Sequence, residues 1–62
     1  MTDIRLFEAG RGRIAVLRAG ASVGVLERAR IGVRRMWMAT RPDGSRGVFA
    51  ARRDAVAWLA RR

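Results

Sequence analysis

The chain contains no cysteine and no histidine among its 62 residues. The absence of cysteine excludes a disulfide framework, a thiolate zinc site and a cysteine nucleophile. The absence of histidine removes the usual metal ligand and the usual general base near neutral pH. We therefore expect no metal and no cofactor.

Acidic residues are also scarce, and lysine is absent. Five carboxylates accompany fourteen basic residues, all of them arginine, for a formal net charge of +9. The richness in alanine, arginine and glycine is typical of GC-rich codon usage, which explains arginine in place of lysine but not the shortage of acids. A basic excess of this size favours a polyanionic partner, most often nucleic acid.

Catalysis has little support in the sequence. Each carboxylate is near an arginine or in a turn, and no pair is suited to acid–base work. The serines have no base partner, and the glycine-rich segments lack the spacing of a phosphate-binding loop. The sequence therefore predicts that the protein is not an enzyme.

Long apolar segments are missing as well. No run approaches the roughly 20 residues that span a membrane, and residues 1–3 do not open a signal peptide. A cationic membrane-active peptide would need a long amphipathic helix, which the glycines and a Pro-Asp-Gly turn interrupt. We expect one small domain over residues 1–62, a cytoplasmic location and no membrane partner.

The C-terminal half predicts a β-hairpin followed by a helix, a unit covering residues 33–61. Residues 37–41 and 46–49 read as short strands, and Pro-Asp-Gly-Ser at 42–45 is a strong turn signal. From about residue 51 to 61 the apolar period becomes helical. One stripe of that helix carries Ala51, Ala55, Trp58 and Leu59. Asp54 lies in its first turn and Arg61 and Arg62 at its end, as a helix dipole favours.

The N-terminal half predicts a second hairpin. Residues 4–10 and 14–20 resemble each other at a spacing of ten, and Arg11-Gly12-Arg13 between them is a turn candidate. We therefore expect a hairpin over residues 4–18.

Residues 21–36 fit two structures. Val23, Leu26 and Arg30 have helical spacing, and Ser22 is a candidate N-cap. The β-branched residues favour a strand instead, and each of two interior glycines costs a helix about 1 kcal/mol. We favour the strand.

A strand over residues 25–31 would place Leu26, Arg28 and Arg30 on one face. The sequence then predicts an α+β fold, a small antiparallel sheet of three to five strands packed on one C-terminal helix.

The segment over about residues 32–60 resembles a known family. GVRRMW, MATR and GVF, with four residues between GVF and Asp-Ala, resemble the Apetala/ethylene-response-factor type of DNA-binding domain. The same pattern is similar to the arm-type N-terminal domain of phage tyrosine integrases. The resemblance implies three antiparallel strands packed on one helix, with the sheet in the DNA major groove.

The resemblance also implies roles for individual residues. It assigns DNA contacts to Arg34, Arg35, Trp37 and Arg41, and helix–sheet packing to Phe49, Ala55 and Trp58. The chain departs from the family pattern where a capping threonine is replaced by Ala51, and its N-terminal hairpin has no counterpart there.

The candidate nucleic-acid-binding residues are six arginines and one tryptophan. Arginine binds a phosphate or the edge of guanine through two parallel hydrogen bonds, and phosphate contacts make affinity salt-dependent. The alternative is a solvated face that maintains solubility. Trp37 either stacks on a base or belongs to the core, because both faces of residues 37–41 are partly apolar. The set is Arg28, Arg30, Arg34, Arg35, Trp37, Arg41 and Arg46.

The leading hypothesis is a small stand-alone DNA-binding protein of phage, plasmid or integrase-associated type, which uses an arginine-bearing β-sheet face. Duplex DNA is the first expected partner and RNA the second, with dimerisation or cooperative binding compatible with the small size. The alternative is a phage- or plasmid-type inhibitor or adaptor that binds an acidic surface of a host protein. The words GRI and ARIG also resemble swapped-hairpin transition regulators, a different fold with the same function.

Overall fold

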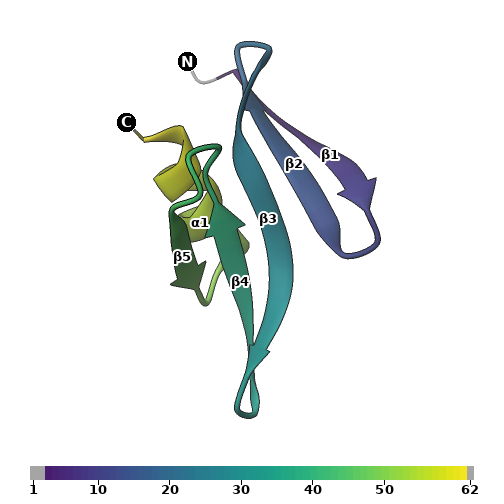
Figure 1. Ribbon diagram of the computed structural model, residues 1–62, viewed down its shortest axis with the longest axis vertical. Coiled ribbons are helices and arrows are strands. Elements are labelled where there is room, and N and C mark those ends of the chain that lie inside the picture. The colour runs from purple at the N-terminus through teal and green to yellow at the C-terminus, as the bar shows by residue number, and fades with distance from the viewer. Residues whose placement is uncertain (1–2, 62) are drawn as a thin grey trace.

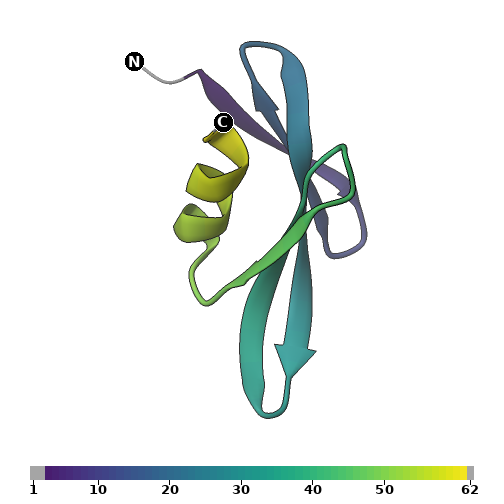
Figure 2. The same cartoon turned by 60° about the vertical axis from the view of Figure 1, so that its left-hand side comes forward.

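The computed structural model describes residues 3–61. The chain forms a five-stranded antiparallel sheet in the order β1-β2-β3-β4-β5, with one helix against one face (Figures 1 and 2). This is the predicted α+β architecture. The elements are β1 (Ile4–Gly10), β2 (Arg13–Arg18), β3 (Ala21–Ile31), β4 (Arg34–Thr40), β5 (Arg46–Phe49) and α1 (Arg52–Ala60).

The middle of the chain is strand, so the helical alternative for residues 21–36 is wrong. Leu26 is fully buried, while its neighbours along β3 alternate with it between the two faces. The pairing continues to Ile31 against Arg34, so β4 begins three residues before the predicted start at Trp37. Gly32 adopts a positive φ of 63° in the turn between the two strands.

The predicted turn at residues 42–45 and the strand after it are both observed. The Asp43 carboxylate accepts hydrogen bonds from the hydroxyl (2.7 Å) and the backbone N–H (2.9 Å) of Ser45. These two bonds hold the pKa of Asp43 below its ordinary value, with the side-chain bond the larger cause. β5 then runs antiparallel to β4, with Phe49 opposite Trp37.

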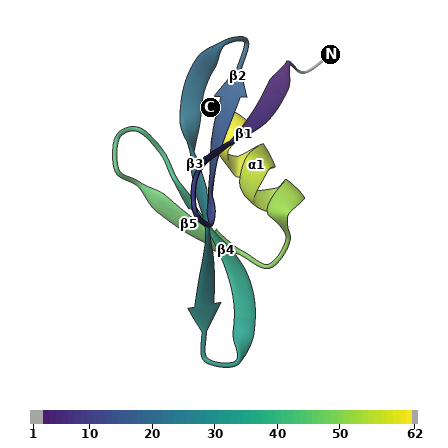
Figure 3. The same ribbon diagram turned by 90° about the vertical axis from the view of Figure 1, so that its right-hand side faces the viewer.

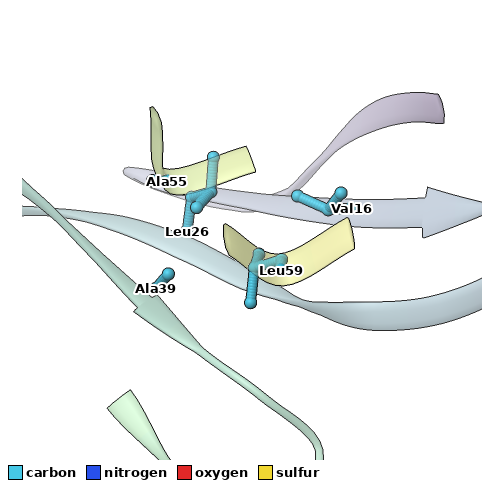
Figure 4. Packing of buried hydrophobic residues seen from close by; sticks show 5 residues of the cluster. All are labelled: Val16, Leu26, Ala39, Ala55 and Leu59. Carbon is cyan, nitrogen blue, oxygen red and sulfur yellow. The ribbon is translucent and has the colours of Figure 1, made fainter. Parts of the chain in front are cut away.

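The core lies between the helix and the middle of the sheet. It contains side chains from β2, β3, β4 and α1 (Figure 4). Partly buried Phe49 and Trp58 pack beside it, with ring centroids 5.6 Å apart. The packing roles that the resemblance implied for Phe49, Ala55 and Trp58 are confirmed. The fully or almost fully buried hydrophobic residues are Val16, Leu26, Ala39, Ala55 and Leu59.

Close approach of the helix to β3 requires a glycine. A Cβ at Gly24 would lie 2.6 Å from a Leu59 methyl carbon and 2.4 Å from the Thr40 carbonyl oxygen, and its φ is +149°. The irregular pairing of β2 with β3 between Val16 and Leu17 lies beside this position. Gly24 therefore lets Leu59 reach the sheet.

The helix ends are stabilised unequally. Ala51 makes no side-chain cap, as the sequence predicts. The last carbonyls of α1, in contrast, accept hydrogen bonds from two arginines, one at the end of β2 and one directly after β4. Arg18 donates to the Ala60 carbonyl at 2.6 Å and Arg41 to the Trp58 carbonyl at 3.0 Å. Within residues 3–61, α1 is too short to cross a bilayer.

Candidate nucleic-acid interface

The β3–β4 hairpin extends beyond the rest of the sheet. The pairing of β2 with β3 stops at Glu27, and the pairing of β5 with β4 reaches only to Trp37. Residues 28–36, which we name the arm, therefore form a two-stranded ribbon that lies beyond both neighbouring strands (Figure 3). At about 3.3 Å per residue, its four-residue strand is roughly 13 Å long.

The arm carries four arginines and no acidic residue. Arg28 and Arg30 alternate along β3 in phase with buried Leu26, so they lie on the side of the sheet that faces the helix. Arg35 is directly opposite Arg30 in the pairing and shares that side. Arg34 lies on the other side. Three of the four guanidinium groups are thus gathered on one face of the ribbon.

The arm arginines have no counter-charge from the part of the chain that the structure describes. Among residues 3–61, the ion pairs are a short one between Arg13 and Glu27 (2.6 Å) and a long one between Arg5 and Asp3 (4.0 Å). Both lie outside the arm, so no carboxylate of the described chain is within 4.0 Å of an arm guanidinium. The charge of the ribbon faces solvent unneutralised.

Like charges face each other on this surface. Arg30 and Arg35 are cross-strand partners, and such an arrangement destabilises a strand pair. They line a shallow hollow of about 290 Å³ together with Arg28 and Ala29. An anion placed there would meet three guanidinium groups and relieve their repulsion.

The tip of the arm is apolar. Val33 in the turn is 98% exposed, and Ile31 beside it is 53% exposed. Two aliphatic side chains exposed to water at a hairpin tip do not stabilise the fold. Clusters of exposed apolar side chains are typical of surfaces that contact a partner. The ribbon therefore combines charged sides with an apolar end.

Trp37 lies at the base of the arm and faces the helix side. It packs against the buried cluster and is only partly accessible. The guanidinium carbon of Arg28, its cross-strand partner, lies 5.4 Å from the centre of its ring. The ring thus packs on the core and fixes Arg28 at the base of the arm.

Two of the predicted contact residues lie elsewhere. The Arg41 guanidinium stacks 3.8 Å from the ring centre of Trp58 and binds the helix end. Arg46 is exposed at the start of β5, and its partner Thr40 lies on the face opposite buried Ala39. The structure brings together Arg28, Arg30, Arg35 and Trp37, and it separates Arg34, Arg41 and Arg46 from them.

The start of the helix also contributes to the surface at the base of the arm, and the sequence did not predict this. Arg52, the first residue of α1, lines the same groove as Arg28 and Trp37. Arg52 is not among the residues that the sequence predicts for this surface, because no pattern indicates which strand the start of a helix will approach. Arg53 and Arg61 are exposed, and Arg62 is outside the described residues.

The face of the sheet opposite the helix is largely apolar. Val25, Met36, Met38 and Val48 alternate with the helix-side residues and lie on this open face, with Glu27 among them. No element of the described chain covers them. We name this surface the open face.

The described residues form no cluster of metal ligands. Within residues 3–61, no three acidic, cysteine or histidine side chains gather in a way that would hold a metal ion. Comparison with protein-family models, curated proteins and solved structures finds no match for the chain. The helix packed on antiparallel strands agrees with the resemblance found in the sequence, while β1 and β2 enlarge the sheet beyond three strands.

Proposed function

We propose that the protein binds duplex DNA through the arm and the arginines beside its base. The observation that carries this proposal is the set of arm guanidiniums that have no carboxylate of residues 3–61 within 4.0 Å and are gathered mainly on one side of a projecting ribbon. A surface with this charge binds phosphates favourably. When an arginine neutralises a phosphate of DNA, counterions that had condensed on the DNA are released, and this release adds to the affinity.

The dimensions of the arm fit a groove of DNA. The major groove of B-DNA is about 12 Å wide and admits a two-stranded β-ribbon. In this arrangement Arg30 and Arg35 contact phosphates or guanine edges, and the apolar tip at Val33 contacts thymine methyl groups or sugars. In this arrangement the ribbon, and not the flat face of the sheet, contacts the base edges of the DNA.

Fluorescence anisotropy with a labelled duplex at several salt concentrations tests the proposal. The double variant Arg30→Gln/Arg35→Gln removes two charges from the arm, and Arg53→Gln/Arg61→Gln removes two from the helix surface as a matched control. Loss of two phosphate contacts should lower the log–log salt slope by about 1.8, since each contributes roughly 0.9. The control should keep most of the wild-type slope.

Two results would count against the arm. Equal losses in both double variants would mean general electrostatic attraction without a defined surface. Absence of binding by the wild type at low salt would overturn the proposal.

A second candidate function is binding to an acidic protein, as an inhibitor or adaptor. The open face favours it, because Val25, Met36, Met38 and Val48 form an apolar area flanked by arginine. Protein interfaces are apolar at the centre and charged at the rim. Stoichiometric binding that persists at physiological salt and is lost on Met38→Glu, with no DNA binding, would select this function.

A further inference from the structure

A groove opens on the helix side of the sheet, where three parts of the chain meet. It has a volume of about 520 Å³ and lies between the β1–β2 hairpin, the base of the arm and the start of α1. Ligand sites in proteins commonly measure about 300–1,000 Å³. Its lining includes Leu6, Phe7, Ile14, Arg28, Trp37 and Arg52.

The two sides of the groove differ in character. Leu6 and Ile14 supply an apolar side from the N-terminal hairpin, because both lie on the same face of the sheet as buried Val16, and Leu6 is 40% exposed although it is large and hydrophobic. Arg28 and Arg52 supply two cations from the opposite side. A ligand that satisfies both sides has a flat apolar part joined to an anion.

One further residue limits the chemical class of ligand that the groove can bind. Glu8 also lines the groove, and no arginine among the described residues lies within 4.0 Å of its carboxylate. A carboxylate accepts hydrogen bonds from an amino group such as N4 of cytosine, and it repels a purely anionic or fatty ligand. A nucleobase with an exocyclic amine, linked to a phosphate, fits all three: the base fits the apolar side, the phosphate fits the two arginines, and the amine fits the carboxylate of Glu8.

We propose that this groove binds one unpaired nucleotide. Its base lies between the Leu6 side and the Arg28 guanidinium plane that is fixed over Trp37, because unstacked bases stack on aromatic and guanidinium surfaces. Its phosphate lies by Arg28 and Arg52, and Glu8 accepts from its amino group. This inference rests on the proposed function, since the arm binds the nucleic acid directly beside the groove.

The test compares a labelled single-stranded 8-mer of cytosine with the duplex used above. Loss of the apolar side on which the base lies should make Leu6→Glu weaken single-strand binding by about tenfold or more, with less than a twofold effect on the duplex. Glu8→Gln should reduce the preference for a cytosine 8-mer over a thymine 8-mer. Arg52→Gln is the second groove variant should Leu6→Glu fail to fold.

The outcomes separate the groove from the arm. If the groove variants leave single-strand binding unchanged while duplex binding persists, the groove inference is wrong and the proposed function stands. If Arg30→Gln/Arg35→Gln weakens neither kind of binding and leaves the salt slope unchanged, the arm is wrong instead.

Nuclear magnetic resonance with cytidine 5′-monophosphate distinguishes a free nucleotide from a strand. The indole N–H signal of Trp37 should shift on addition, whereas that of Trp58, which stacks with Arg41 away from the groove, should not. A shift with the mononucleotide alone assigns the groove to free nucleotides, and a shift only with the 8-mer assigns it to a strand. Equal shifts of both signals or none with either ligand would refute the groove.

Discussion

Arg41 illustrates how an arginine that looks like a DNA contact in the sequence is held by a local partner. Its guanidinium donates to the Trp58 carbonyl at 3.0 Å and stacks on the Trp58 ring at 3.8 Å. Both contacts come from a residue seventeen positions later. No local pattern around residues 37–41 reveals this, because only the docking of the helix brings Trp58 there.

Gly24 provides a prediction at the same scale. Gly24→Ala adds a methyl group against Leu59 and the Thr40 carbonyl, in a backbone conformation that alanine rarely adopts. Overpacking of this kind costs about 1–3 kcal/mol, and the backbone strain adds to it. Urea denaturation followed by circular dichroism should show the loss in the free energy of unfolding.

Gly12→Ala is the matched control for this variant. Gly12 also has a positive φ, +71°, but a Cβ there meets nothing within 4 Å. The control therefore carries the conformational strain without the clash. Equal destabilisation by the two variants would show that Leu59 does not need the space at Gly24.

At the scale of elements, the sequence predicted the kind of each element better than its bounds. The predictions for β5 and the turn before it agree with the structure, because the Pro-Asp-Gly turn residues and the short alternating strand determine their structure from neighbouring residues alone. The start of β4 was missed because the two arginines there carry no apolar alternation, and pairing with β3 extends the strand through them. Likewise, charge alone did not show that Arg34 and Arg35 lie on opposite faces.

The candidate site was predictable only in part for a related reason. Arg28 and Arg30 were placed on one strand face because they alternate with Leu26 in the sequence. The groove combines β1, β2, the arm base and the start of α1, which are separated by many residues. The residues that line the groove are brought together by the pairing of the strands and the docking of the helix. Neither can be predicted from the sequence of one segment alone.

The turn between β4 and β5 predicts a pH dependence. The pKa of Asp43 is lowered in the folded state from its ordinary value of 3.8, so its contribution is present above that pH and is lost as the pH falls through the lower folded value. Asp43→Asn lacks this ionisation. Thermal unfolding between pH 5 and 2 should show a smaller decrease in Tm for the variant, and parallel curves would contradict this role of Asp43.

For the whole molecule, the dominant fact is a net charge of +9 with few internal partners. Repulsion among guanidiniums opposes the folded state and is screened by salt. We expect Tm to rise by a few degrees between 20 and 200 mM sodium chloride, since about 1 kcal/mol shifts the Tm of a domain this size by roughly 4–8 °C.

The arm accounts for part of that repulsion through Arg30 and Arg35. The Arg30→Gln/Arg35→Gln variant should therefore gain less in Tm from the same addition of salt, as measured by calorimetry. An identical gain in wild type and variant would mean that the arm pair is already screened by water.

The order of the strands has a kinetic consequence. Each strand pairs with the strand before or after it in the chain, so every hairpin closes a short loop. The docking of α1 on β2, β3 and β4 joins segments that lie farther apart in the chain. Such local pairing predicts fast collapse of the sheet, with the barrier to folding set by the moment when Leu59 enters beside Gly24.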